Sequence, residues 1–184
     1  LQHIKSYTKS PSRYGFHGTL KPPFALHPDY KIEDLDQAIT ELTADMSASN
    51  PTRLIVKRIG HFLALCPERE DGSFSNIAAT CVKKLDPFRK PPGEEELQER
   101  RARGLTDRQE AYLQEWGYPY VLEEFRFHLT LTDSLETDAL DLIETRLQSA
   151  TESLRERPFT LDRLCLFGDP GCGAPFRLLK SYSL

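Results

Sequence analysis

The chain has 184 residues, 39% hydrophobic and 28% charged, which suits one globular domain or two small lobes and argues against a disordered chain. Its net charge of −4 argues against a broadly basic nucleic-acid-binding surface, although a local basic pocket is compatible with it. No apolar run approaches the roughly 20 residues that cross a bilayer, so we expect a cytoplasmic protein without a membrane partner. The first residue is Leu1 rather than Met, so we expect a chain trimmed from a longer protein.

The first half of the chain predicts one strand, two helices and a hairpin. A strand is expected over Arg13–Lys21. The following Pro22-Pro23 should end it, because proline has no backbone N–H to donate to a neighbouring strand. Apolar residues at helical spacing predict a helix over Ile32–Ala48 and another over Phe74–Leu85. Between these helices, residues 52–68 are typical of two strands that break at Gly60-His61.

A segment rich in charge and proline follows and is predicted to connect two halves. It should contain a short solvated helix over Glu94–Arg103. A second helix should begin at Thr106, because Thr106 and Gln109 have the spacing of a capping box, and Gly117 should close it.

The second half repeats the order of elements in the first. We expect a strand over Glu123–Thr132, a helix over Thr137–Leu154, and strands over Phe159–Phe167 and Pro175–Leu184 with a glycine-rich loop between them. Each half therefore predicts strand, helix, strand, strand. This repetition indicates an α+β unit that has been duplicated within the chain.

The duplication predicts one bilobal domain over residues 1–184. Lobe one should cover about 1–86, the connector about 87–117 and lobe two about 118–184. Duplicated units tend to pack about a pseudo-twofold axis, which would place equivalent strand faces opposite each other across a groove.

The motif Phe-His-x-Thr-Leu occurs twice, once in the expected first strand of each half, and its histidines are His17 and His128. Because side chains alternate between the faces of a strand, the polar members of each motif share one face. These polar faces carry Gly15, His17, Thr19 and Lys21 in the first strand and Arg126, His128, Thr130 and Thr132 in the second. The opposite faces, which carry Phe16, Gly18 and Leu20 and then Phe125, Phe127, Leu129 and Leu131, are expected to face the core.

Two histidines that face each other across a groove can divide acid–base work. One neutral imidazole takes a proton from water or a hydroxyl, and the other, protonated, gives a proton to the leaving oxygen, since the ordinary pKa of histidine is about 6.5. Threonine hydroxyls and cations can hold the non-bridging oxygens of a phosphate. We therefore predict four catalytic residues and two substrate-binding cations, which are His17, His128, Thr19 and Thr130, and Lys21 and Arg126.

Simpler roles compete with these interpretations. A lone H-x-T triplet is a weak signal, and a strand histidine is often structural. Lys21 and Arg126 lie at the ends of their motifs, where solvation is the alternative. Tyr14, Tyr118 and Tyr120 adjoin the motif strands and are candidates to stack on a ribose or base, although core packing is the alternative.

The sequence predicts neither a metal nor a cofactor. No third histidine, cysteine or carboxylate stands at ligand spacing beside either motif. The four cysteines form no C-x-x-C pair and are expected to be reduced thiols; they are Cys66, Cys81, Cys165 and Cys172. His3, His27 and His61 lack the threonine and the strand context, so we expect surface or loop residues there.

The repeated H-x-T motif resembles the two-histidine phosphoesterase superfamily, which includes RNA cyclic phosphodiesterases and 2′,5′-RNA ligase-like proteins. The stretches RYGFHGTLKPPF, LTDRQEAYLQEWGYPYV and FRFHLTLT look like its bacterial branch associated with phosphonate metabolism. The similarity runs from about Arg13 to the C-terminus. Members of this branch usually have a further strand before the first motif, so we expect lobe one to be incomplete here.

The resemblance implies an antiparallel sheet in each lobe, a cleft between the sheets and helices outside. It also implies metal-independent hydrolysis or formation of a phosphoester, often a cyclic one, with His17, Thr19, His128 and Thr130 at the catalytic positions. The association of the branch suggests a small cyclic sugar phosphate, such as 5-phosphoribosyl 1,2-cyclic phosphate, as the substrate.

Two other functions stay open at this point. One is RNA end processing, as a 2′,3′-cyclic phosphodiesterase or a 2′,5′-ligase-like enzyme, and the other is a non-catalytic module that binds a nucleotide or phosphate. The acidic net charge favours a small phosphate-containing substrate over nucleic acid. The oligomeric state, the direction of the reaction and the assignment of acid and base are left open by the sequence.

Overall fold

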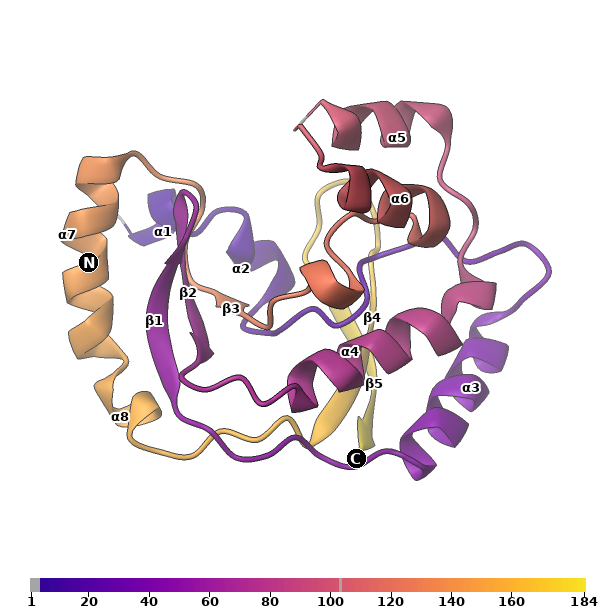
Figure 1. Cartoon of the computed structure of the whole chain (residues 1–184), viewed down its shortest axis with the longest axis horizontal. Coiled ribbons are helices and arrows are strands. Elements are labelled where there is room, and N and C mark those ends of the chain that lie inside the picture. Colours follow the sequence, from indigo (N-terminus) through magenta and orange to yellow (C-terminus); the bar gives the residue numbers. More distant parts are fainter. Residues whose placement is uncertain (1–3, 103) are drawn as a thin grey trace. The chain divides into compact units, whose positions relative to one another are not determined.

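The computed structural model describes residues 4–102 and 104–184, and it has the predicted mixed α+β character with two antiparallel sheets (Figure 1). The chain forms two compact units, each made of segments that are distant in sequence. Unit 1 contains Leu1–Thr19, Ala48–Asp71 and Phe127–Ser183, and unit 2 contains Leu20–Ser47, Gly72–Arg126 and Leu184. The predicted lobes, connector and duplication stay predictions. Within the described ranges, every helix falls short of the length and apolar character needed to cross a membrane.

Unit 1 contains a three-stranded antiparallel sheet in the order β1-β2-β3. Strands β1 (Leu54–Ile59) and β2 (Phe62–Pro67) pair from Leu54 opposite Pro67 to Ile59 opposite Phe62. This leaves a two-residue turn in which the first residue, Gly60, has a φ of +55°, as the turns of tight hairpins require. The break predicted at this point is confirmed, and the hairpin is the tall purple ribbon in Figure 1.

The central strand β2 carries much of the core of unit 1. Its residues from Leu63 to Pro67 are all buried. Helix α7 (Thr137–Ala150) contacts both β1 and β2 and buries Leu140. The helix predicted over residues 137–154 is therefore confirmed in type, but Thr151 separates α7 from a short second helix, α8 (Glu152–Arg155).

The second sheet of unit 1 pairs β4 (Arg163–Gly168) with β5 (Arg177–Ser183), and both strands were predicted. Their register shifts between Leu166 and Phe167, which is the mark of a β-bulge. The glycine-rich loop between the strands is also present.

The strand predicted over Arg13–Lys21 is wrong. Residues Pro11–Tyr14 form a short helix, α2, after another short helix, α1 (Ile4–Tyr7), and residues 15–21 have no regular secondary structure. Pro11 suits the first turn of a helix, and Gly15 ends it with a φ of +74° while its N–H donates to the carbonyl of Pro11. The expected alternation fails accordingly, because Phe16 is 62% exposed instead of facing the core.

The strand predicted over Glu123–Thr132 is much shorter than expected. A 3₁₀ turn, η2 (Leu122–Glu124), precedes it, and β3 covers only Leu129–Thr130, with Ala64 of β2 opposite Thr130. Thr132 was expected on the polar face, but it is buried and its hydroxyl accepts a hydrogen bond from the Leu63 N–H at 3.0 Å. The inward position of the Thr132 side chain is explained by the buried Leu63 N–H, which needs a hydrogen-bond acceptor.

Unit 2 is helical, and the predicted helices are present in it. Helix α3 (Ile32–Ala44) ends four residues before the predicted boundary, whereas α4 (Ser73–Lys84) lies within one residue of it. A 3₁₀ turn, η1 (Asp86–Phe88), follows α4, and α4 also contacts η2. The buried side chains of α4 are Phe74, Ile77, Ala78, Cys81 and Val82.

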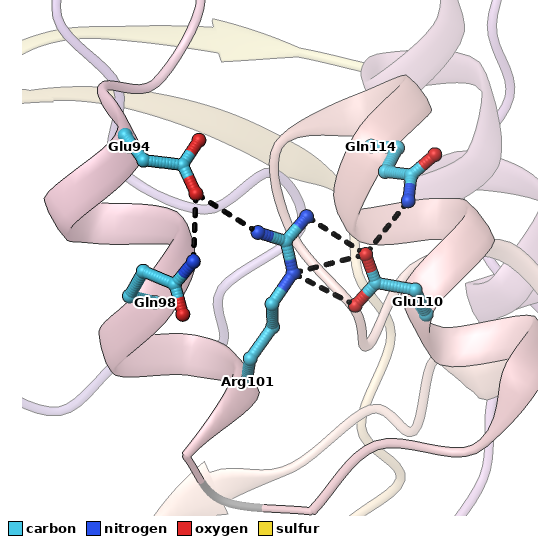
Figure 2. Close-up of polar contacts among 5 residues, drawn as sticks. All are labelled: Glu94, Gln98, Arg101, Glu110 and Gln114. Atoms are coloured by element: carbon cyan, nitrogen blue, oxygen red, sulfur yellow. Dashed lines mark hydrogen bonds and ion pairs between the residues drawn. The ribbon is translucent and has the colours of Figure 1, made fainter.

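Helices α5 (Glu94–Arg101) and α6 (Asp107–Trp116) are joined by polar side chains (Figure 2). The guanidinium of Arg101 donates to both carboxylate oxygens of Glu110 and, at 3.3 Å, to Glu94. All residues of α5 are described and none of them is fully buried, so the helix has no core side chain of its own. The predicted solvated helix is thereby confirmed, although it ends at Arg101.

The predicted capping box at the start of α6 is confirmed. The Gln109 N–H donates to the Thr106 hydroxyl at 3.3 Å, and the Thr106 N–H donates to the side chain of Gln109 at 3.1 Å. Gly117 closes the helix with a φ of +71° and donates to the carbonyl of Leu113. Two backbone donors that a helix start leaves without partners are thus satisfied.

Replacing the cap should weaken the fold measurably. We expect Thr106→Ala to lower the free energy of unfolding by about 1 kcal/mol, because the Gln109 N–H loses its acceptor. Urea denaturation would measure the change. Thr145→Ala is the control, since Thr145 is exposed inside α7 and bonds only the preceding turn, so a change within about 0.5 kcal/mol is expected. Equal losses in the two variants would contradict the capping role.

Candidate functional site

The two H-x-T segments lie in contact within unit 1. A Cβ added to Gly18 would lie 2.7 and 2.9 Å from ring atoms of Phe127 and 3.3 Å from a methyl carbon of Leu129. Gly18 directly follows His17, and Phe127 and Leu129 stand on either side of His128. The structure therefore brings together two motifs from opposite halves of the chain, and the missing side chain at position 18 permits the approach.

The imidazole of His17 is fixed at both ring nitrogens. Nδ1 lies 3.1 Å from the carbonyl oxygen of Gly15, and Nε2 lies 3.1 Å from the hydroxyl of Thr19. A carbonyl oxygen can only accept, so Nδ1 must carry a proton. In the neutral ring, Nε2 is then the atom with the free electron pair, and it faces the threonine that the motif predicts as its partner.

Two aromatic rings lie near the imidazole of His17. The ring of Tyr14 stacks near the imidazole at 5.7 Å between centroids and an interplanar angle of 27°, and the ring of Phe167 lies at 6.1 Å. Tyr14 also packs on Phe176 at 4.8 Å. The tyrosine predicted to bind substrate is thus beside the first histidine, while its contact with a substrate stays a prediction.

Three neighbours of this site were missed by the sequence reasoning: Arg13, Phe167 and Phe176. Arg13 bonds Asp169, where a hydrogen bond from the Gly171 backbone and a second one from Arg13 hold the pKa of the carboxyl below its ordinary value. Only the position of Arg13 next to the first motif could have indicated from the sequence that it belongs to this site. The two phenylalanines flank a loop near the other end of the chain, and no local pattern connects them to His17.

The second histidine, His128, lies directly before β3 and is half-buried. Its ring is 5.7 Å from the ring of Phe62, the first residue of β2. Thr130 follows in β3 and is held by the pairing with Ala64. Main-chain pairing with the buried strand β2 therefore positions the second motif, whereas side-chain and turn contacts position the first.

The predicted substrate ligand Lys21 lies in unit 2 and is held there by protein groups. Its ammonium group donates to the carbonyl of Val82 at 3.2 Å and to Asp86 at 3.3 Å, and it lies 5.4 Å from the ring of Phe24. The side chain is only 8% exposed, and this burial lowers the pKa of the Lys21 amine. These contacts describe a structural anchor after the first motif, and contact with a substrate stays a prediction.

The remaining predicted ligands are also in unit 2. Arg126 is exposed, and Tyr118 and Tyr120 pack edge to face at 5.7 Å. The guanidinium of Arg100 lies 4.8 Å over the ring of Tyr118. Contact of Arg126, Tyr118 and Tyr120 with a substrate therefore stays a prediction.

The other histidines behave as expected where the structure describes them. His61 is exposed in the β1–β2 turn, and His27 is in a loop, where its Nδ1 accepts from the Asp29 N–H at 3.3 Å. His3 lies outside the described residues. Across residues 4–102 and 104–184, no group of three or more His, Cys, Asp or Glu side chains could hold a metal ion, and metal independence stays a prediction.

The four cysteines are free thiols, as predicted. Cys66 and Cys81 are buried, and burial raises the pKa of both thiols, that of Cys81 to about 11. Because the thiolate is the reactive form, neither of these two is a candidate nucleophile.

With the geometry established, comparison with known proteins places the chain. Residues 19–177 match a family described as "Protein of unknown function (DUF1045)". The chain belongs to the DUF1045 family. The matched region contains the whole second motif and Thr19 of the first, whereas His17 lies two residues before it.

Two curated relatives of this DUF1045 chain carry the name "Ribose 1,5-bisphosphate phosphokinase PhnN". The protein from Janthinobacterium sp. (strain Marseille) is 37% identical over 177 residues, which cover 94% of this chain and 39% of the relative. The protein from Laribacter hongkongensis (strain HLHK9) is 30% identical over 169 residues, which cover 92% of this chain and 39% of the relative. The DUF1045 chain therefore spans about two fifths of the length of these relatives.

The contact at Gly18 predicts a specific sensitivity. We expect Gly18→Ala to lower the free energy of unfolding by about 1–3 kcal/mol, because the new methyl group meets the rigid ring of Phe127, which is 4% exposed and packed on Phe159. Thermal and urea denaturation would measure the loss.

The matched control for this variant is Gly168→Ala. Neither glycine has a positive φ, but the methyl group at 168 would meet only the flexible side chain of Leu179, which is largely exposed and can move. A loss at position 18 no larger than the loss at position 168 would show that the two motif segments are not closely packed.

The anchor of Lys21 predicts a pH-dependent stability. Burial works to raise the pKa of Asp86, but hydrogen bonds from Arg89 and the charge of Lys21 hold it below its ordinary value of 3.8. The ionised carboxyl therefore stabilises the fold above pH 3.8, and this contribution is lost as the pH falls through the folded-state pKa. We expect Asp86→Asn to cost about 1.5–3 kcal/mol of unfolding free energy at pH 7, and less at about pH 3.

Urea denaturation at both pH values would test this expectation. Asp141→Asn is the control, because Asp141 pairs with Arg58 at an exposed position where the loss should stay below about 1 kcal/mol. An Asp86→Asn deficit that is the same at both pH values would contradict the role of the charge.

Proposed function

We propose that this DUF1045 protein is a phosphodiesterase that opens a small cyclic phosphate ester, using two histidines as general acid and general base and no metal ion. The observation that carries the proposal is the contact of Gly18 with the residues on either side of His128, which places the two H-x-T motifs next to each other. The second support is the hydrogen-bonded state of His17, whose Nε2 faces Thr19. The imidazole of His17 paired with a hydroxyl, together with a second H-x-T motif in a neighbouring segment, supplies the groups that acid–base hydrolysis needs.

The proposed reaction is a single displacement at phosphorus. One histidine takes a proton from water as the oxygen attacks, the bond from phosphorus to one ring oxygen breaks, and the other histidine protonates that leaving oxygen. The hydroxyls of Thr19 and Thr130 hold non-bridging oxygens and stabilise the charge that develops on them. The assignment of acid and base depends on how the substrate lies and is left to experiment.

The names of the relatives support a particular substrate. Opening the ring of 5-phosphoribosyl 1,2-cyclic phosphate by breaking the bond between phosphorus and O2 gives ribose 1,5-bisphosphate. This product is the compound on which the relatives act according to their name. We therefore propose that the DUF1045 segment supplies the substrate of a kinase, in line with the expected association with phosphonate breakdown. The kinase reaction itself is not assigned to this chain, which spans only 39% of each relative.

Turnover followed by phosphorus NMR tests the proposal. The substrates are 5-phosphoribosyl 1,2-cyclic phosphate, 2′,3′-cyclic nucleotides and an oligonucleotide with a terminal cyclic phosphate, each in the presence of EDTA. We expect ring opening of the sugar phosphate that resists EDTA, and a fall in rate of about 10²–10⁴-fold in His17→Ala and in His128→Ala. His61→Ala is the matched control, because His61 is exposed in a turn away from both motifs in sequence, and full activity is expected.

Each other outcome has a defined meaning. Faster turnover of the oligonucleotide than of the sugar phosphate would favour RNA end processing, and binding of phosphate ligands without turnover would favour a non-catalytic module. A parallel reaction with ribose 1,5-bisphosphate, ATP and Mg²⁺ tests the kinase activity named for the relatives, and no product is expected. Normal turnover in either histidine variant would sink the two-histidine mechanism.

A further inference from the structure

Arg13, which stands four residues before His17, is bound to the loop between β4 and β5. Its Nε donates to the carbonyl of Ala174 at 3.1 Å, and its Nη2 donates to the carboxylate oxygens of Asp169 at 2.9 and 2.8 Å. Its own carbonyl accepts from the Phe176 N–H at 2.9 Å. One residue just before the first motif thus holds both ends of a loop near the other end of the chain.

The loop has a conformation that needs such support. Three consecutive residues have positive φ angles, Gly171 at +81°, Cys172 at +51° and Gly173 at +72°. A side chain at positive φ is strained, so Cys172 keeps this conformation only where its surroundings impose it. Asp169 provides part of the restraint, because it accepts from the Gly171 N–H at 2.9 Å as well as from Arg13.

One end of this loop carries a ring that lies near His17, and the other end carries a ring that packs on Tyr14. Phe167, just before the loop, lies 6.1 Å from the imidazole, and Phe176, just after it, packs at 4.8 Å on Tyr14, which stacks near the imidazole. The guanidinium carbon of Arg13 lies 5.1 Å from the centre of the Phe176 ring and 5.9 Å from that of Tyr14. Arg13 therefore contacts both the loop between β4 and β5 and the rings of Tyr14 and Phe176.

We propose that Arg13 is a positioning residue for His17, which it acts on through this loop. By holding Asp169 and Ala174 together, it keeps the surrounding rings in place, and these rings keep the imidazole in the orientation in which Nδ1–H donates to Gly15. A guanidinium suits this role because Nε and Nη2 are separate donor atoms held in one rigid plane, whereas all donors of a lysine ammonium radiate from a single nitrogen. The effect on rate rests on the proposed phosphodiesterase function, whereas the effect on the imidazole does not.

The orientation of His17 can be measured without any substrate. Long-range proton–nitrogen NMR of the full chain labelled with ¹⁵N-histidine reports which ring nitrogen carries the proton, and the spectrum of His17→Ala identifies the signals of His17. We expect the wild type to show the form protonated at Nδ1, and Arg13→Ala and Arg13→Lys to show a mixture of both neutral forms.

Arg58→Ala is the matched control for the arginine variants. Arg58 also pairs with carboxylates, those of Asp141 and Glu144, and its side chain is 34% exposed against 31% for Arg13. It lies on β1 and its described ion pairs are with α7 rather than with the loop. The spectrum of His17 in this variant should match the wild type.

Kinetics with the best substrate complete the test. We expect kcat to fall about 10²-fold in Arg13→Ala, with a smaller change in KM, because a misplaced acid–base group slows the chemical step rather than binding. Arg13→Lys should restore little of this loss. A folded Arg13→Lys variant with the wild-type form of His17 overturns the proposal, as does a raised KM with unchanged kcat, which would place Arg13 on the substrate. Absence of turnover in the wild type would refute the proposed function alone, and the NMR comparison would still decide the role of Arg13.

Discussion

The arrangement of both motifs depends on one close contact, between the backbone of Gly18 and the ring of Phe127. Phe127 is buried and packs on Phe159, so it forms a fixed surface against which the irregular first motif is laid. The first motif has no strand of its own to place it, so this contact supplies what a sheet would otherwise provide. The residues next to His17 and His128 in sequence meet at this contact.

Around this contact, early and late segments of the chain hold each other in place. The second motif forms β3 and pairs with β2 from the earlier part of the chain, while the first motif is bonded through Arg13 to the loop before β5. Each motif segment is therefore bonded to a hairpin that is distant from it in sequence. Rigid support of this kind is what the proposed pair of acid–base groups requires, since small displacements are costly for catalysis.

Most helices and strands were predicted from signals that lie within a few residues. The parts that the sequence did not predict depend on contacts between residues that are distant in the chain. The hairpin turn at Gly60 and the cap at Thr106 were readable because their cause lies within a few residues. The first motif was expected to be a strand from its alternation of polar and apolar residues, whereas Pro11 and Gly15 favour a helical turn and its end just before it. The histidines were identified from their repeated motif, but Arg13 was not assigned a role, because its partners lie in a loop near the other end of the chain.

The interleaving of unit 1 has a consequence for how the chain can be divided. A break in the link between α5 and α6 would leave β1 and β2 on one fragment and β3, β4 and β5 on the other. Neither fragment would carry the complete three-stranded sheet, and the first motif would be separated from the loop that fastens it. The two fragments could rebuild the site only by associating, so the paired motifs belong to the chain as a whole and to neither half by itself.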